Sequence, residues 1–314
     1  MKKKAIIISI KGAKLSKKER LLFLRENPWG VILFKRNLKK EIQIKKLVSN
    51  IRFLTKTKNF PIMIDEEGLN VSRLNNLITH SASSSFFGHL YQKDKVLCIN
   101  LYKQYLSSLC KKLYRYGINI NTIPVLDILR NNTSKILNNR IFSKDKKIVK
   151  ELGKITIDLL KKNKIGSVIK HIPGHGCSKI DSHKKMPIVK HSINKLNKID
   201  FYPFKKSRSQ FAMTAHILYE ELDKNNVATF SKKIIKNIIR KKIGFKGILI
   251  SDDISMKALK YDVVTNAKKS LEAGCNLVLY CAGNINENLK LIKSVPYIDK
   301  FTQKKTSAFY KFLR

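Results

Sequence analysis

Residues 148–171 read IVKELGKITIDLLKKNKIGSVIKH, a stretch that contains a predicted helix followed by a predicted strand. Apolar residues recur there at spacings of three and four, as in a helix with one buried face: Ile148, Leu152, Ile155 and Leu159. Ser167–His171 then forms a short apolar run of strand length. A helix that leads directly into a buried strand is the repeating unit of parallel α/β folds, so this segment indicates an α/β protein.

The same alternation of short apolar runs and longer amphipathic segments extends over the whole chain. The other strand candidates are Ala5–Ile10, Val31–Phe34, Pro61–Asp65, Ile118–Asp127, Phe211–His216, Gly247–Ser251 and Asn276–Cys281, which makes eight in all. Eight strand and helix units without a Gly/Ser-rich linker predict a closed (β/α)8 TIM barrel, with residues 1–314 as a single domain. An open doubly wound sheet is the alternative, but residues 10–14 lack its glycine-rich phosphate turn.

The charge of the chain is strongly positive, with 65 Lys and Arg against 22 Asp and Glu and a formal net charge of +43. Such a charge could attract a polyanion, and it keeps a nucleic-acid-binding protein open as an alternative. The lysines nevertheless occur as pairs in nearly every predicted helix, for example Lys161-Lys162 and Lys268-Lys269, as on solvated helix faces. Lys, Ile and Asn are also the residues of A/T-rich codons, so the base composition of the genome is a sufficient cause of the many lysines. We therefore expect no nucleic-acid partner.

The cysteines and the first residues bear on the compartment. The five cysteines form no CxxC pair, and an odd number does not suit a disulfide framework, which favours a reducing compartment. Residues 1–10 imitate the start of a signal peptide, but Lys11 and Lys14 end the apolar run too early, so we interpret it as a first strand. No apolar stretch approaches the roughly 18 to 20 residues of a membrane span, and we expect none.

Polar residues gather where the predicted strands end, which is where barrels of this type hold their active sites. These residues are Asp65-Glu66-Glu67, Asp127, Lys170-His171, His216 and Ser251-Asp252-Asp253. Alternation along a strand sends Asp252 and Asp253 to opposite sides, so one carboxylate should reach the barrel mouth as a nucleophile, a metal ligand or a general base. A cap for a helix starting at Met256 is the structural alternative, and it suits Asp253 better than Asp252.

Residues 170–183, KHIPGHGCSKIDSH, hold three of the seven histidines, and their glycines and proline indicate a shaped loop rather than a helix. Asp181 and His183 stand two residues apart, so the carboxylate could orient the imidazole as a general acid/base. A metal site is the competing interpretation, with these candidate ligands: His171, His175, Cys177, Asp181 and His183. It ranks second because the loop offers no helical face for a zinc-binding His pair, and Lys170 would repel a cation.

Two segments carry a family resemblance. Residues 240–256, RKKIGFKGILISDDISM, and residues 170–183 resemble the nucleophile signature and the histidine loop of NagZ-type bacterial β-N-acetylglucosaminidases (β-N-acetylhexosaminidases) of glycoside hydrolase family 3. The resemblance runs nearly end to end. It implies that Asp252 is the nucleophile, that His183 is the acid/base and that Asp181 is its partner.

The same resemblance implies a substrate site and a reaction. The residues that would hold a terminal N-acetylglucosamine are Asp65, Arg73, Arg140, Lys170 and His171. The implied reaction is a retaining double displacement without cofactor or metal, in which a cytoplasmic monomer releases N-acetylglucosamine from peptidoglycan-derived anhydro-muropeptides during cell-wall recycling.

The chain also departs from the family pattern. Leu69 and Asn70 replace a glycine and an arginine, and Asn139 replaces an aspartate next to Arg140. If the lost glycine needed a positive φ, Leu69 would strain the loop. These departures keep open a barrel that binds sugar without cleaving it, and a β-glucosidase or xylosidase of the same family is a further alternative.

Overall fold

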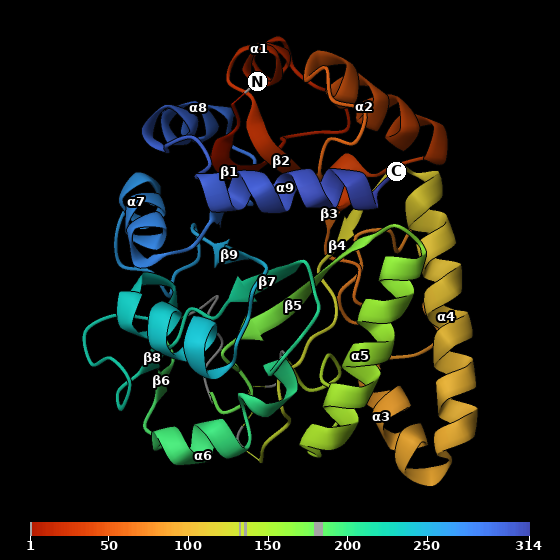
Figure 1. Cartoon of the computed structure of the whole chain (residues 1–314). Helices are drawn as coiled ribbons and strands as arrows, with labels where there is room; N and C mark the ends of the chain where they lie inside the picture. Colours follow the sequence, from red (N-terminus) through yellow and green to blue (C-terminus); the bar gives the residue numbers. More distant parts are fainter. Residues whose placement is uncertain (1, 132, 135–136, 179–184) are drawn as a thin grey trace.

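Eight parallel strands form a closed barrel in this computed structural model, which describes residues 2–131, 133–134, 137–178 and 185–314 (Figure 1). The strands are β1 (Lys4–Ser9), β2 (Pro28–Leu33), β3 (Ile62–Ile64), β4 (Ile120–Asn121), β5 (Gly166–Ile172), β7 (Phe211–Thr214), β9 (Ile248–Asp253) and β10 (Leu277–Leu279). Their order around the ring is β1-β10-β9-β7-β5-β4-β3-β2, and β1 closes it on β10 through Ile6 opposite Val278. The predicted (β/α)8 barrel is confirmed, and each strand candidate overlaps one of these strands.

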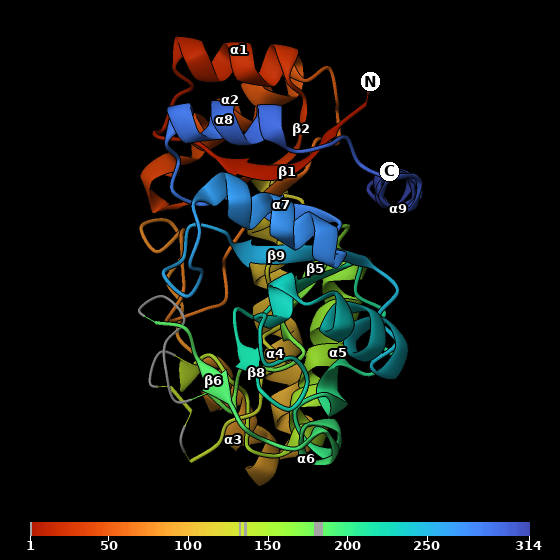
Figure 2. The same cartoon turned by 90° about the vertical axis from the view of Figure 1, so that its left-hand side faces the viewer.

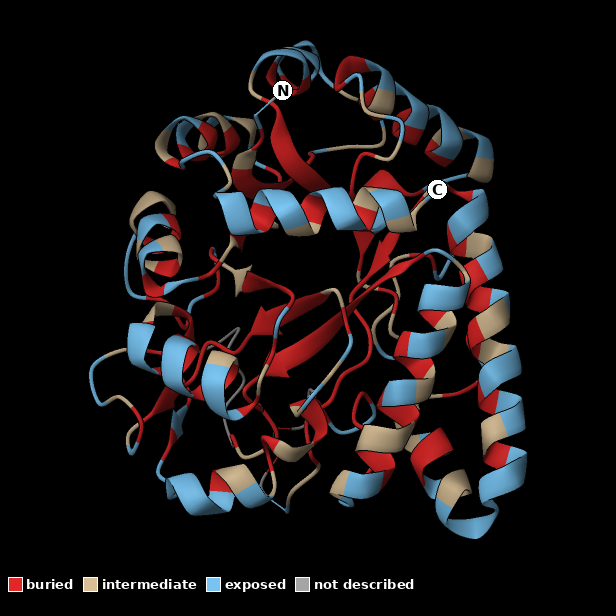
Figure 3. Cartoon of the chain, viewed as in Figure 1, coloured by how far each residue is buried: buried red, intermediate tan, exposed pale blue. Residues whose placement is uncertain are grey.

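Helices surround the barrel and turn their apolar faces toward it (Figure 3). They are α1 (Lys17–Arg25), α2 (Glu41–Leu54), α3 (Ser84–Lys93), α4 (Lys95–Arg115), α5 (Lys146–Lys162), α6 (Ile193–Lys198), the π-helix η5 (Ile234–Lys242), α7 (Val263–Ala273), α8 (Ile285–Ser294) and α9 (Lys300–Phe312). In α5, Ile148 and Leu152 are buried and Leu159 packs against the same core, as the spacing of the apolar residues predicts. The lysines of these helices lie mainly on the outward faces, where water solvates them. The high positive charge is therefore compatible with a single buried barrel core.

Helix α9 covers the end of the barrel at which the strands begin. Its Phe309 ring contacts Phe211 of β7 at 5.0 Å between centroids, and Thr306 accepts a 2.8 Å hydrogen bond from the indole nitrogen of Trp29. Figure 2 shows α9 on the opposite side of the strands from the loops that leave them. The carboxyl ends of the strands therefore form the mouth, which is where polar side chains can meet a ligand.

Three details differ from the sequence expectations. Strand β4 covers only Ile120–Asn121 of the expected Ile118–Asp127, because Pro124 has no N–H to donate to a neighbouring strand. A separate short pair, β6 (Ile188–Val189) with β8 (Leu218–Tyr219), has no counterpart among the predicted strands. No helix begins at Met256, where the chain forms turns.

Helix α7 begins later, at Val263, and Asp262 caps its amino end. A helix capped by Asp253 is therefore not what the chain forms. The five cysteines are all free thiols. In the part of the chain that the structure describes, no helix is both long and apolar enough to cross a bilayer.

Candidate active site

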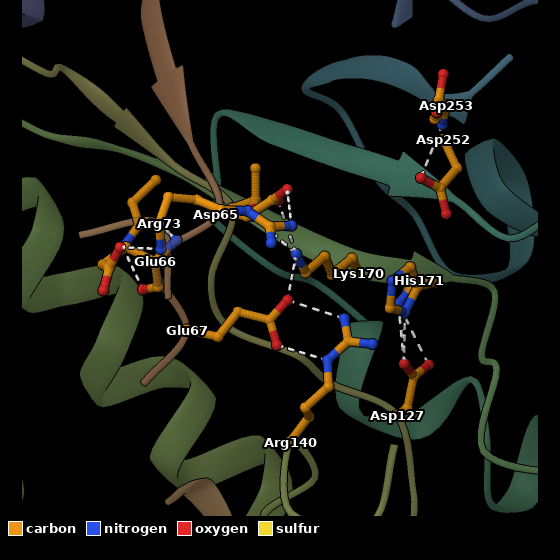
Figure 4. A network of polar contacts seen from close by, with 12 residues as sticks. Asp65, Glu66, Glu67, Arg73, Asp127, Arg140, Lys170, His171, Asp252 and Asp253 are labelled. Atoms are coloured by element: carbon orange, nitrogen blue, oxygen red, sulfur yellow. Dashed lines mark hydrogen bonds and ion pairs between the residues drawn. The ribbon is translucent and has the colours of Figure 1, made fainter. Parts of the chain in front are cut away.

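Lys170 leaves β5 at the barrel mouth and is only 2% exposed. Its Nζ lies 2.6 Å from Glu67 Oε1 and 3.3 Å from Asp65 Oδ1, and it donates a 2.7 Å hydrogen bond to Thr122 Oγ1 (Figure 4). The Thr122 hydroxyl in turn donates to Asp65. A buried ammonium group is tolerated when charges and hydrogen bonds surround it, so β3, β4 and β5 together build a fixed cationic point.

Arg140 and Glu67 form a two-point ion pair beside Lys170. Arg140 Nε lies 2.7 Å from Glu67 Oε2, and its second nitrogen donates to Oε1 at 2.8 Å. Burial raises the pKa of Glu67, but Arg140 and Lys170 outweigh it and bring the pKa to about 2. Asn139, the residue before Arg140, accepts a 3.3 Å hydrogen bond from the Ser85 hydroxyl.

Arg73 completes the cluster on the β3 side. Its guanidinium donates to Asp65 Oδ2 at 3.1 Å and lies 5.3 Å from the ring centroid of Phe34. Burial raises the pKa of Asp65, but Lys170 and Arg73 outweigh it, so the pKa is well below its usual range. Ionised carboxylates and cations held in place in this way offer strong, charge-assisted hydrogen bonds to hydroxyl groups.

Glu66 organises the loop that carries Arg73. Its fully buried carboxylate accepts hydrogen bonds from the backbone N–H groups of Arg73 at 2.8 Å and Leu74 at 3.0 Å, and it lies 2.6 Å from His80 Nε2. The positive φ in this loop falls on Gly68, at +134°, whereas Leu69 has no positive φ and is 57% exposed. The replacement of a glycine by Leu69 therefore introduces no backbone strain of the kind considered above.

His171 and the following loop are held by Asp127, a fully buried carboxylate at the end of the β4 segment. Asp127 lies 2.7 Å from His171 Nδ1 and accepts a 2.6 Å hydrogen bond from the His175 backbone N–H. Burial raises the pKa of Asp127, but the nearby His171 outweighs it and lowers the pKa. An ionised carboxylate only accepts, so Nδ1 of His171 donates and the ring is fixed in one orientation.

His175 lies in the same loop with a different environment. Burial and the neighbouring His171 lower its pKa to about 4, so its ring is neutral near pH 7. Beyond it, the Tyr219 hydroxyl donates to the Gly174 carbonyl at 2.6 Å, and the Thr133 hydroxyl donates to the Gly176 carbonyl at 2.7 Å. The loop is thus anchored up to that point by side chains from other segments.

Asp252 and Asp253 end β9, and their side chains point in opposite directions, as alternation along a strand predicts (Figure 4). The Asp252 carboxylate accepts a 2.8 Å hydrogen bond from the Asp253 N–H. The Asp253 carboxylate accepts hydrogen bonds from the Ser255 hydroxyl at 2.7 Å and from the Cys281 N–H at 3.1 Å. Asp253 therefore fastens the β9 loop to the end of β10.

His216 supports the end of β9 through a hydrogen bond to its backbone. Its Nε2 lies 3.0 Å from the Asp253 carbonyl, and its Nδ1 lies 2.7 Å from the Thr229 hydroxyl. A carbonyl only accepts, so Nε2 carries the proton. Burial lowers the pKa of His216, which keeps the ring neutral in this role.

The predicted acid/base pair, Asp181 and His183, lies outside the described residues, so its geometry stays a prediction. The metal interpretation of this loop also stays untested, because two of its five candidate ligands, Asp181 and His183, lie outside the described residues. Over residues 2–131, 133–134, 137–178 and 185–314, no group of three or more His, Cys, Asp or Glu side chains is arranged to hold a metal ion.

The family follows from comparison with known proteins. The sequence model of the N-terminal domain of glycosyl hydrolase family 3 matches residues 3–306. The chain belongs to glycosyl hydrolase family 3. Among its family 3 relatives, a β-hexosaminidase of Nitrosomonas eutropha is 31% identical over 281 residues, which are 88% of this chain and 80% of the relative. A β-hexosaminidase of Actinobacillus succinogenes is 31% identical over 319 residues, covering 98% and 90% of the two chains.

Solved family 3 structures agree in fold. Native NagZ from Neisseria gonorrhoeae superposes with a TM-score of 0.89 at 28% identity, covering all of this chain and 90% of that one. A second structure of that NagZ, in complex with N-trifluoroacetyl-D-glucosamine, gives a TM-score of 0.88. The family resemblance read from the two sequence segments is confirmed.

Sequence reasoning placed Asp65, Arg73, Arg140 and Lys170 in one site, and the structure brings them together. It did not assign Glu67, Asp127 or His216 a role, although their positions at strand exits marked all three. Thr122 carried no comparable signal, because only the fold puts its hydroxyl between Lys170 and Asp65.

Proposed function

We propose that this chain is a retaining exo-β-N-acetylglucosaminidase that removes terminal β-linked N-acetylglucosamine from peptidoglycan-derived anhydro-muropeptides. The observation that carries the proposal is the buried ionic cluster of Asp65, Glu67, Arg140 and Lys170 at the barrel mouth, with Asp252 at the same end of the barrel on β9. The β-hexosaminidase relatives support the choice of sugar. The cysteine pattern favours a reducing compartment, and this supports action in the cytoplasm during cell-wall recycling.

The cluster can orient a sugar ring before reaction. Asp65 accepts hydrogen bonds from ring hydroxyls and Arg140 donates to them, while Lys170, whose three N–H groups face Glu67, Asp65 and Thr122, fixes these partners in place. His171, whose Nδ1 is committed to Asp127, presents its other ring nitrogen as a further polar contact. Arg73 holds Asp65 in place and adds positive charge at the rim.

The proposed chemistry is a double displacement. Asp252 attacks the anomeric carbon while His183 protonates the departing glycosidic oxygen, which leaves a glycosyl-enzyme ester and a neutral alcohol. His183, oriented by Asp181, then takes a proton from water, and the resulting hydroxide equivalent displaces Asp252 from the sugar. Two inversions at one carbon retain the configuration.

Two features favour Asp252 over its neighbour as the nucleophile. The Asp253 carboxylate is occupied by Ser255 and Cys281, and it belongs to the loop rather than to the mouth. Burial also raises the pKa of Asp253, which reduces the fraction of the reactive, ionised form at low pH. A nucleophile needs an ionised oxygen at the barrel mouth, and that is the role the family resemblance implies for Asp252.

An assay on two chromogenic substrates tests the proposal. We expect turnover of the β-N-acetylglucosaminide, little turnover of the β-glucoside, and release of the β-anomer as the first product by NMR. Asp252→Ala and His183→Ala should each lower kcat/KM by roughly 10³-fold or more, as losses of catalytic groups do elsewhere. Asp253→Asn is the matched control and should keep most of the turnover. If the wild-type protein turned over neither substrate, or if Asp252→Ala remained active, the proposal would fail.

A further inference from the structure

A large groove lies on the face of the barrel opposite the candidate active site. Its volume is about 1190 Å³, and its walls come from the end of α2, the end of α4, Lys164 after α5, and residues 310–314. The first three of these segments precede β3, β4 and β5, so the groove opens at the amino ends of the strands. Nothing in the proposed glycosidase reaction uses this face.

The groove is lined by basic side chains and, among its nineteen described lining residues, by no Asp or Glu. Two of its cations, Lys45 and Arg115, pair with Glu41 at 2.8 and 2.6 Å. Lys56 and Lys58 are exposed, and neither forms an ion pair with a carboxylate in the described part of the chain. The lining therefore carries positive charge that an anionic ligand could neutralise.

Two exposed aromatic rings lie among these cations. Phe53 on α2 is 79% exposed and Tyr114 on α4 is 69% exposed, and both line the groove. Single exposed apolar side chains are ordinary on protein surfaces, so the informative feature of these two rings is their position among the cations of the groove. Aromatic faces beside lysines and arginines are the combination that binds single-stranded nucleic acid, because bases stack on the rings while phosphates contact the cations.

We propose that this groove binds single-stranded nucleic acid, with phosphates on Lys56 and Lys58 and bases against Phe53 and Tyr114. A flat bilayer surface would not enter a concave groove, and a second copy of a chain of charge +43 would be repelled. A flexible anionic strand fits both the shape and the charge. The sequence led us to expect no such partner because its lysines are dispersed, and only the fold assembles this set on one face.

Fluorescence anisotropy with the full chain and a labelled oligouridine of about 20 nucleotides tests this site. The double variant Lys56→Gln/Lys58→Gln should bind about tenfold or more weakly, and the slope of log K against log salt should become shallower by about 1.4, or 0.7 for each lost phosphate contact. The matched control is Lys232→Gln/Lys233→Gln, which removes the same charge from exposed positions at η5. The control should bind like the wild type.

A second pair of variants separates nucleic acid from polyanions in general. Phe53→Ala/Tyr114→Ala should weaken oligouridine binding about fivefold or more, because stacking contributes at least about 1 kcal/mol per base, and should leave heparin binding unchanged. Turnover of the chromogenic glycoside should stay at the wild-type value in all these variants, so the result is independent of the proposed reaction. Equal weakening by both lysine pairs, or no effect of the aromatic pair, would overturn the proposal.

Discussion

Glu67 contacts Lys170 and Arg140 with the same carboxylate: its Oε1 lies 2.6 Å from Lys170 Nζ, while Arg140 bonds both of its oxygens at 2.7 and 2.8 Å. One anion from the β3 loop therefore fixes two cations that come from different parts of the chain.

Replacing Glu67 by Gln should destabilise the protein and weaken substrate binding. The amide keeps the shape, but Arg140 loses its paired carboxylate and Lys170 loses one of its two, and breaking a buried pair costs roughly 3–5 kcal/mol. We expect a lower free energy of unfolding in urea and a raised KM for the β-N-acetylglucosaminide. Glu272→Gln, at an exposed position, is the control and should change neither quantity. An unchanged KM in Glu67→Gln would show that the cluster does not hold the sugar.

The stability difference between wild type and Glu67→Gln should depend on pH in a defined direction. The pKa of Glu67 is lowered from 4.5 to about 2, so its carboxylate stabilises the folded state above 4.5 and loses this effect as the pH falls toward 2. The difference in free energy of unfolding should therefore be constant near neutral pH and shrink between those two values. Urea titrations at a series of pH values measure it, and a difference that grew on acidification would contradict this sign.

Gly68 and Leu69 should respond differently to substitution, because only Gly68 has a positive φ. Gly68→Ala should destabilise by about 1–3 kcal/mol, because φ is +134° and a Cβ would lie 3.0 Å from the Tyr105 hydroxyl. Leu69→Gly should not relieve strain and should instead lower stability by about 0.4–1 kcal/mol through added freedom of the unfolded chain. Thermal and urea unfolding of both variants provide the comparison. A stabilising Leu69→Gly would reveal strain at Leu69.

His216 should act as a positioning residue for Asp252. His216→Leu removes the hydrogen bond to the Asp253 carbonyl, and small shifts of a reacting group can cost up to about 100-fold in rate. We expect kcat to fall roughly 10- to 100-fold with little change in KM, and partial recovery in His216→Gln, which keeps a donor. A change in KM alone would assign His216 to sugar binding instead.

The barrel could be predicted from the sequence because each strand is a short apolar run and each helix repeats its apolar residues at three and four. The length of strand β4 was overestimated because the residues after Asn121 look equally apolar. The prediction also gave too little weight to Pro124, which has no N–H to donate. Strands β6 and β8 were missed because they are two residues long, and Ile188 is 46% exposed. Such short pairs depend on tertiary contacts rather than on local pattern.

The candidate site residues stay predictions, and the sequence did not indicate how they pair with one another. Family resemblance named Arg140 and His171, but their partners, Glu67 and Asp127, lie 73 and 44 residues away along the chain. Strand-exit position marked both carboxylates without indicating which cation each would meet. The roles of Asp252, Asp181 and His183 stay predictions, and the Asp252→Ala and His183→Ala variants test two of them.

Closure of the ring through β1 and β10 also sets the order in which the protein can be completed during synthesis. Ile6 emerges from the ribosome first, yet its partner Val278 follows only after nearly the whole chain has been made. Until then β1 has an unpaired edge, so the last step of folding waits for translation of the final strand, and a nascent chain is exposed to aggregation in the interval.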